Sequence, residues 1–338
     1  MTDFKINQLQ PQLVQTFDRI IAEKRLAHAY LFEGEKGTGK VDLATWIAMR
    51  LFCQHVEDGQ PDGTCPECQR VLTGNHPDFI RIQPDGQRIK VDAVRYFKAE
   101  ISKSGMESSR RIFVIEDAEK LTTGAANSLL KFLEEPAANI LTILTTSAKN
   151  QILPTVLSRL QIVHFPPLAR PVLIKEIQDQ QIATTSAPLL AHLTNDLGVA
   201  KEWMADDYLP QLTDKVWQWA ERVLKHDDEA FVLVQTQLMP AAKDKEQVPL
   251  VLQVLELVFR DLLNVRYNVT DDLSFPAQQT QLKQWSQRLT TQQLVAMQMA
   301  VLEARKQRWY NVSLQNVLES LTLKLLQIAT NSAGRSAL

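Results

Sequence analysis

LFEGEKGTGKV, at residues 31–41, is the stretch that decides the fold we expect. Two glycines, Gly34 and Gly39, flank four residues and are followed directly by Lys40, which is the phosphate-loop pattern. Residues 29–32 before it are apolar, as in a buried strand, and residues 41–53 after it have helical spacing. A glycine loop between a strand and a helix N-terminus presents backbone N–H groups to a phosphate. The sequence therefore predicts a loop able to bind ATP or ADP, formed by Gly34, Gly37, Thr38, Gly39, Lys40 and Val41.

Two features of the sequence depart from a site that hydrolyses nucleotide. Val41 stands where a Ser or Thr hydroxyl would ligate the nucleotide's Mg²⁺. Glu116 and Asp117 follow an apolar run but reverse the usual Asp-Glu order, which disturbs both the metal ligand and the carboxylate that acts on water. Because phosphoryl transfer depends on positioning and electrostatics, we expect nucleotide binding without hydrolysis. The alternative is an ordinary tight turn that binds nothing.

Strands and helices alternate along the first half of the chain. The patterns predict strands at 29–32, 79–82, 112–115, 140–144 and 161–165, and helices at 6–27, 41–53, 91–102 and 121–135. Residues 55–84 otherwise read as a loop or insertion. Alternating strands and helices imply a parallel sheet that binds ligands at the carboxyl ends of its strands. The predicted fold class is therefore α/β, followed by an all-α region.

The Pro166-Pro167 pair marks the expected end of the sheet domain, since proline can neither join a ladder nor sit inside a helix. Beyond it only helical periodicity recurs. We predict three domains: residues 1–165 with the sheet, a small helical domain at 166–211, and a larger helical domain at 212–338.

The composition is that of a water-soluble globular protein. The 338 residues carry a net charge of -2, with 22% charged and 45% hydrophobic residues. This balance argues against a protein that binds nucleic acid on its own, which would carry a basic excess. Neither a signal-peptide core at the N-terminus nor an apolar run of membrane-spanning length is present. We expect a cytoplasmic protein without a membrane contact.

Three cysteines point to a metal site rather than to a disulfide framework. Cys65 and Cys68 form a CxxC pair, and Cys53 upstream offers a third thiolate. Tetrahedral zinc takes four ligands, so one is still needed, and Asp62 and His55 are the two candidates. The alternative is a loop of reduced thiols with no metal.

Several motifs resemble, in order and spacing, those of the delta-prime family of bacterial DNA polymerase III clamp-loader subunits, which are AAA+ proteins. They are HAYLFEGEKGTGK (28–40), the cysteine loop (53–68), GNHPD (74–78), IFVIEDAEKL (112–121), AANSLLKFLEEP (125–136) and LPTVLSR (153–159). Residues 311–325 resemble the family's C-terminus more loosely. The last two motifs of the first half are the most specific to this family.

The resemblance implies an AAA+ phosphate-loop domain, a small helical lid and a C-terminal helical collar. It also implies a hetero-pentameric ring with the delta subunit and the tau or gamma ATPase, which places a sliding clamp on primed DNA. Members of this family are generally inactive in hydrolysis. Their Ser-Arg motif, here Ser158 and Arg159, supplies an arginine to ATP on the neighbouring ATPase, a contribution worth roughly 10³–10⁵ in rate in related systems. Without the family, Arg159 would read as an ordinary surface charge.

The family pattern also selects the fourth metal ligand. Aligning GNHPD makes Cys53, Cys65 and Cys68 the first, third and fourth ligands, with Asp62 in place of the second cysteine. The resemblance thus implies a structural zinc loop at about 53–76 with a Cys₃Asp ligand set. Leu160 replaces a usual cysteine after Arg159, which leaves the arginine itself unchanged.

Three rival functions remain at the level of sequence. An active clamp-loader ATPase, similar to tau or gamma, is opposed by Val41 and by the order of Glu116 and Asp117. A small-molecule kinase is opposed by AANSLLKFLEEP and by the long helical second half. A free-standing zinc protein that binds nucleic acid is opposed by the near-neutral charge. We expect no catalysis by this chain alone.

Overall fold

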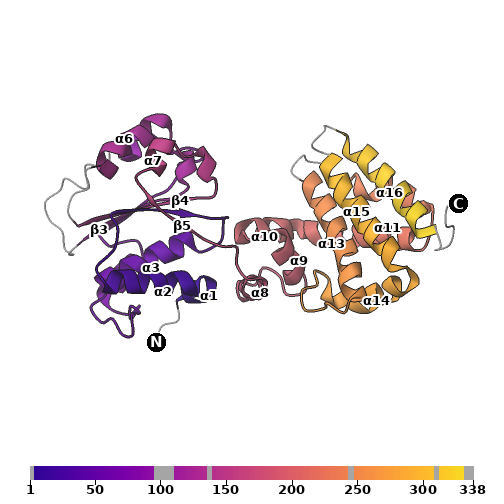
Figure 1. The fold of residues 1–338 in the computed structure, drawn as a ribbon, viewed down its shortest axis with the longest axis horizontal. Helices are drawn as coiled ribbons and strands as arrows, with labels where there is room; N and C mark the ends of the chain where they lie inside the picture. The colour runs from indigo at the N-terminus through magenta and orange to yellow at the C-terminus, as the bar shows by residue number, and fades with distance from the viewer. Residues whose placement is uncertain (1–3, 95–109, 135–138, 243–246, 308–311, 331–338) are drawn as a thin grey trace. The chain divides into compact units, whose positions relative to one another are not determined.

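A computed structural model of the chain describes residues 4–94, 110–134, 139–242, 247–307 and 312–330 (Figure 1). The chain divides into two compact units, residues 1–172 and residues 173–338. The first contains a parallel sheet, and among the described residues of the second all regular secondary structure is helical. The predicted fold class, α/β followed by all-α, is confirmed. The division into three domains stays a prediction.

The sheet has five parallel strands in the order β2-β3-β4-β1-β5. Their bounds are Ala29–Glu33 for β1, Phe79–Ile82 for β2, Arg111–Ile115 for β3, Ile140–Thr146 for β4 and Gln161–His164 for β5. All five predicted strands are therefore confirmed. Because the strands are parallel, the carboxyl ends of β1, β3 and β4 lie at one edge of the sheet.

Helices cover both faces of this sheet (Figure 1). The helices α1 (Lys5–Leu9), α2 (Pro11–Ala22) and α3 (Lys40–Phe52) lie on one face, and α6 (Thr123–Glu134) and α7 (Pro154–Leu157) lie on the other. The alternation of side chains along β1 serves both layers. Tyr30 and Phe32 meet Phe17 of α2 edge to face, whereas Leu31 joins the core that contains Leu129 of α6.

The single helix predicted over residues 6–27 is wrong. The chain forms α1 and α2 instead, with a break at Gln10, where φ is −141° and ψ is 60°. Pro11 explains the break, because its ring disfavours helical backbone at the preceding residue while suiting the first turn of a new helix. The helix also ends earlier than predicted, at Ala22.

Within residues 55–84, read from the sequence as loop and one short strand, the structure has a further helix. Helix α4 spans Pro66–Leu72, and the Cys65 sulfur caps it by accepting from the Cys68 N–H. Seven residues are too few for helical periodicity to stand out in a sequence. The helix predicted at 91–102 lies mostly outside the described residues; only residues 91–94 are described, and they are helical.

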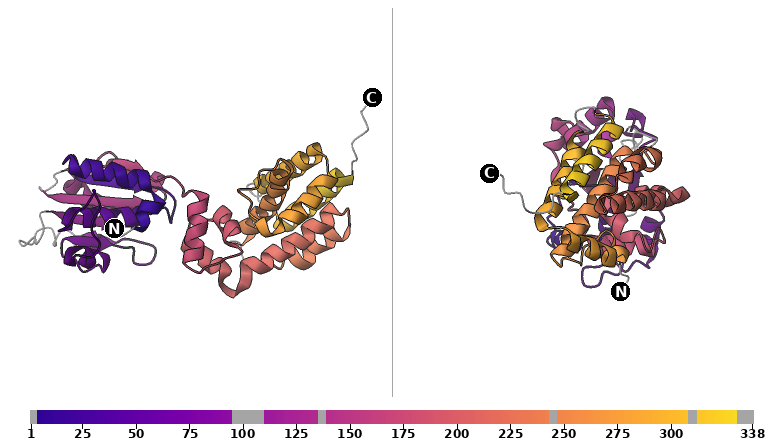
Figure 2. Two further views of the ribbon diagram at one scale, coloured as in Figure 1. Left: turned by 90° about the horizontal axis from the view of Figure 1, so that it is seen from below. Right: turned by 90° about the vertical axis from the view of Figure 1, so that its right-hand side faces the viewer.

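The second unit is built from packed helices, seen from two further directions in Figure 2. The central helix α13 packs against α11, α14 and α15, and Trp219 of α11 donates to Thr322 of α16 at 3.1 Å inside the core. No helix among the described residues has the length and apolar character needed to cross a bilayer. The helices are α8 (Arg170–Asp179), α9 (Ala187–Leu193), α10 (Leu197–Met204), α11 (Tyr208–Leu224), α12 (Glu229–Leu233), α13 (Val248–Arg266), α14 (Gln279–Arg288), α15 (Thr291–Gln307) and α16 (Leu314–Thr330).

Candidate functional site

The glycine loop runs from the end of β1 to the first residue of α3, as the pattern predicts. Gly39 has φ 90°, and a Cβ there would lie 2.8 Å from Ile6 Cδ1 of α1. Gly34 is hemmed in as well, because a Cβ would lie 2.6 Å from the carbonyl oxygen of Phe165. Gln10 Nε2 links the loop to the segment after β5 by donating to the carbonyl oxygens of Thr38 and Pro166, at 3.1 and 2.9 Å. Close packing therefore requires glycine at both positions, and at Gly39 the left-handed backbone conformation requires it as well.

Lys40, the residue expected to reach a phosphate, contacts its own loop. Its Nζ donates to the carbonyl oxygens of Gly34 and Glu35, at 2.7 and 2.6 Å, and the side chain is 8% exposed. Burial lowers the pKa of this ammonium, while the negative charges of Glu119, Asp117 and Glu35 oppose the shift. To bind a phosphate, Lys40 would have to exchange these two carbonyl oxygens for phosphate oxygens.

The two acidic residues after β3 are engaged with cations from this chain. Glu116 Oε1 accepts from Nε and Nη2 of Arg81, at 2.8 and 2.6 Å. Asp117 Oδ2 lies 2.9 Å from Lys120 Nζ, and its backbone N–H donates to Thr145 Oγ1 at 3.2 Å. The sheet thus brings the loop and the acidic pair to the same edge, as predicted, but neither carboxylate faces the loop unpaired.

Glu119 is a residue of this site that the sequence reasoning missed. Its Oε1 accepts from the N–H and the hydroxyl of Ser147 after β4, at 3.3 and 2.8 Å. Its Oε2 is buried and has no hydrogen-bond partner among the described residues. The residue lies in the same motif as Glu116, two positions after Asp117, and this position was the signal that could have found it. The negative charge of Glu119 favours the charged form of Lys40.

The cysteine loop brings together the four residues that the family resemblance selects as candidate metal ligands. One donor atom from each of Cys53, Asp62, Cys65 and Cys68 lies within 4.8 Å of the others. The sulfurs of Cys53 and Cys65 are 4.0 Å apart. Two Zn–S bonds of about 2.3 Å at the tetrahedral angle place sulfurs about 3.8 Å apart, so this spacing fits zinc. His55, the other candidate, is not a member of this group among the described residues.

Backbone N–H groups point at the cluster and favour negatively charged side chains there, which is the form that binds a metal ion. Asp62 Oδ1 accepts from the N–H groups of Cys65 and Thr64, at 3.1 and 3.0 Å, and the contact with Cys65 holds the pKa of the Asp62 carboxyl well below its usual range. Burial raises the pKa of the Cys68 and Cys53 thiols, so a metal would have to displace their protons on binding. Three sulfurs and one carboxylate oxygen fit a structural zinc.

Three polar contacts, made by His76 and Asp78, fix the loop to the sheet. His76 stacks on Phe52 with ring centroids 4.2 Å apart, accepts from the Asp78 N–H at Nδ1, and places Nε2 3.0 Å from Glu67 of α4. Asp78 in turn pairs with Arg111 at 2.9 Å, where β3 begins. These contacts indicate a structural role for His76.

Arg159 lies just beyond α7, and its guanidinium is held by its own chain. Nη1 donates to the carbonyl oxygen of Thr155 at 2.5 Å and to Ser158 Oγ at 3.1 Å. Nη2 forms an ion pair with Glu134, the last residue of α6. The Arg159 side chain is 31% exposed. The sequence reasoning did not assign a role to Glu134, although it lies in the specific motif AANSLLKFLEEP.

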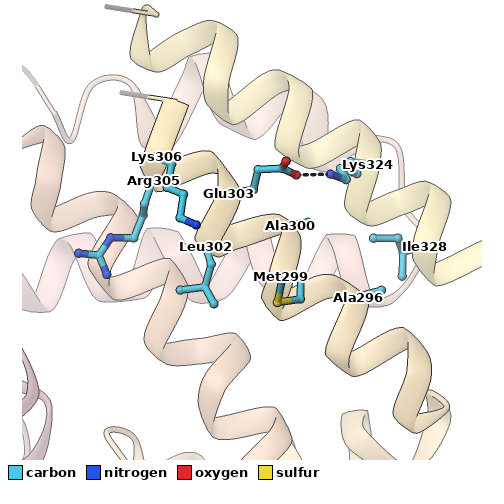
Figure 3. A pocket seen from close by; sticks show the side chains of 9 residues that line it. All are labelled: Ala296, Met299, Ala300, Leu302, Glu303, Arg305, Lys306, Lys324 and Ile328. Carbon is cyan, nitrogen blue, oxygen red and sulfur yellow. Dashed lines mark hydrogen bonds and ion pairs between the residues drawn. The ribbon is translucent and has the colours of Figure 1, made fainter. Parts of the chain in front are cut away.

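The second unit has a surface groove of about 680 Å³ between α15 and α16 (Figure 3). Met299, which is 61% exposed, lies in this groove, and Lys324 bridges to Glu303 across it at 2.7 Å. None of the residues predicted as site residues lines the groove. It is lined by Ala296, Met299, Ala300, Leu302, Glu303, Arg305, Lys306, Lys324 and Ile328.

Several known proteins are similar to this chain. Residues 9–169 match the family model described as "DNA polymerase III, delta subunit". Subunit tau of DNA polymerase III from Bacillus subtilis is 31% identical over 156 residues, which cover 46% of this chain and 28% of that protein. A solved gamma subunit-related protein from Thermotoga maritima covers 94% of this chain and 99% of its own, at 20% identity and a TM-score of 0.39.

One relative extends the similarity to almost the whole chain. DNA polymerase III subunit delta' of Bacillus subtilis is 37% identical over 322 residues, which cover 95% of this chain and 97% of that protein. The similarity therefore includes the helical second unit as well as the sheet. By its sequence along both units, this chain belongs to the delta' subunits of DNA polymerase III.

Proposed function

We propose that this chain is a clamp-loader subunit that does not hydrolyse nucleotide and supplies Arg159 in trans to ATP on a neighbouring ATPase subunit. In this role it joins a hetero-pentameric ring with tau or gamma and delta in the cytoplasm. The ring opens a sliding clamp and places it on primed DNA. The chain itself contributes no complete catalytic site.

The observation that carries this proposal is a contrast between two features. The phosphate loop lacks groups that hydrolysis needs, whereas Arg159 is accessible to a neighbouring chain. Val41 offers no hydroxyl, Lys40 is bound to the loop's own carbonyl oxygens, and Glu116 is paired with Arg81. Each of these features removes part of the positioning on which phosphoryl transfer depends. Arg159, by contrast, lies partly exposed beside a helix end, where a neighbouring chain can reach it. The loop of this chain then serves as a scaffold and, at most, as a nucleotide-binding site.

The experiment that tests the proposal is a reconstitution of the complex with Arg159→Ala. We expect the variant to fold and assemble normally, while the DNA-stimulated ATPase rate of the complex falls. The site that depends on this arginine should lose roughly 10³-fold or more, as trans arginines do in related systems. Arg159→Lys should restore little, because an ammonium lacks the planar fork of a guanidinium. Gln161→Ala, an exposed change on β5, is the matched control. An unchanged rate for Arg159→Ala would exclude the role.

The zinc loop belongs to the same proposal as a structural element. Cys53, Asp62, Cys65 and Cys68 would hold the ion and fix the residues around α4. With four protein ligands the tetrahedral site would be closed, which suits a structural rather than a catalytic zinc.

For the helical collar, the groove between α15 and α16 supports a packing role against other subunits. Val295 and Met299 are exposed on α15, one turn apart, and Met299 lines the groove. Exposed apolar side chains that cluster on one surface are typical of interfaces. Met299→Glu should weaken assembly of the complex in size-exclusion chromatography without changing the melting temperature of the isolated subunit. Gln292→Glu is the control, and equal assembly of both variants would exclude this surface.

An active ATPase of the tau or gamma kind is the alternative function. The similarity to subunit tau, at 31% identity over 156 residues, favours it. Turnover by the isolated chain would distinguish this alternative from the proposal.

A further inference from the structure

The guanidinium of Arg159 is folded back onto its own subunit. Nη1 is shared between the carbonyl oxygen of Thr155, four residues earlier, and the hydroxyl of Ser158. Nη2 is paired with Glu134 Oε1, while Nε is buried without a hydrogen-bond partner among the described residues. Both terminal nitrogens, the two that would form a fork on a phosphate, therefore make contacts within the chain.

The pair with Glu134 also acts on charge. A carboxylate in contact with a guanidinium cancels most of the positive field that a phosphate of a neighbouring subunit would meet. A phosphate oxygen and the Glu134 carboxylate are alternative partners of the same kind, since Arg binds both through charged, forked hydrogen bonds. As it is oriented in this structure, Nη2 of Arg159 cannot bind the Glu134 carboxylate and a phosphate oxygen at the same time.

We propose that Glu134 holds the Arg159 guanidinium in an ion pair in the unassembled subunit. On assembly, the nucleotide phosphate of the neighbouring ATPase subunit replaces Glu134 as the partner of that guanidinium. The inference rests on the proposed trans role of Arg159 and adds a second residue to it. Glu134 is a positioning residue, because it acts through Arg159 and does not itself touch the nucleotide. The Arg159 guanidinium thus keeps a charged hydrogen-bond partner until the phosphate of the neighbouring ATPase subunit is present.

The exposure of the pair sets the size of the effect. The side chains of Arg159 and Glu134 are 31% and 48% exposed, so water screens their attraction. Pairs of this kind contribute on the order of two- to fivefold in an equilibrium constant, about 0.4–1 kcal/mol at about 1.4 kcal/mol per factor of ten. The ion pair between Arg159 and Glu134 is weak enough for a phosphate to displace it, and its effect on association is large enough to measure.

The test is a double-mutant cycle on the association of this subunit with the ATPase subunit. Wild type, Glu134→Gln, Arg159→Ala and the double variant are titrated in the presence of a non-hydrolysable ATP analogue and, separately, of ADP. We expect Glu134→Gln to tighten association two- to fivefold with the ATP analogue and to leave it unchanged with ADP. In the Arg159→Ala background the same substitution should have no effect. Lys131→Gln, at an exposed position one turn earlier on α6, is the control.

Three outcomes would overturn this role of Glu134. They are weaker or unchanged association for Glu134→Gln, a tightening that persists with ADP, or a tightening that persists without Arg159. Glu134→Asp, which keeps the charge on a shorter side chain, should fall between wild type and Glu134→Gln and guards against a folding defect of the latter. Failure of the trans role would look different, since Arg159→Ala would then leave the ATPase rate of the complex unchanged.

Discussion

Arg81 binds the Glu116 carboxylate with two nitrogens, at 2.8 and 2.6 Å, across the neighbouring ends of β2 and β3. Gln83 adds a third contact to the same oxygen at 3.2 Å. The side chain that the motif offers as a metal ligand is therefore already paired with a guanidinium. This arrangement gives a physical reason to expect a silent nucleotide site, beyond the missing hydroxyl at Val41.

The first prediction concerns hydrolysis by the isolated chain. We expect no phosphate release above background, because Lys40, Val41 and Glu116 each fail to supply a part of the reaction. Arg81→Ala frees Glu116 but should not create activity, since no hydroxyl follows Lys40. The measurement is phosphate release by purified protein, with Lys40→Ala as the control for a contaminating ATPase. Turnover that Lys40→Ala abolishes would contradict the prediction.

The second prediction concerns the metal. We expect one zinc per chain in purified protein, and a loss of affinity for Asp62→Ala, because three thiolates leave the tetrahedron one ligand short. Asp62→Cys should restore four ligands and bind zinc at least as tightly as wild type. Elemental analysis and competition with a chromophoric chelator measure content and affinity. Glu57→Ala, at an exposed position of the same loop, is the control. Metal-free wild type, or equal affinity for Asp62→Ala, would exclude this ligand set.

The third prediction concerns Gly39, the glycine directly before α3. Gly39→Ala should lower the free energy of unfolding by about 1–2 kcal/mol, because a side chain is disfavoured at φ 90°. Contact of the new methyl group with Ile6 should add to that cost. Gly124→Ala is the matched control, since no atom lies within 4 Å of its Cβ position and α6 should gain up to about 1 kcal/mol. Urea unfolding of both variants measures the difference, and equal stabilities would show that the loop conformation is not required.

The fourth prediction concerns pH. Burial lowers the pKa of His76, and the charge of Glu67 opposes this only in part. The unfolded chain therefore binds a proton at a higher pH than the folded chain, and stability should fall as the pH drops below about 6.5. His76→Gln should remove part of this pH dependence. Free energies of unfolding at pH 7.5, 6.5 and 5.5, at equal metal content, measure the two slopes. Parallel slopes would show that His76 is not the group responsible.

Patterns within short stretches of the sequence were enough to predict much of this structure. The five strands, the strand–loop–helix around Gly34 and Lys40, and the helical second half follow from side-chain periodicity, which reflects local geometry. The errors were local too. Pro11 breaks the first helix, and α4 is too short to show a period.

What the sequence alone determined is therefore the set of elements, the loop and the residues available to it. Only the tertiary structure decided which partner each charged side chain takes. Arg81 meets Glu116 through the parallel pairing of β2 with β3, and Arg159 meets Glu134 where α7 packs against α6. Such pairs join residues 25 or 35 positions apart. The first pair depends on the register of β2 against β3, and a shift of one residue would turn Arg81 to the opposite face of the sheet. The second depends on the packing of α7 against α6.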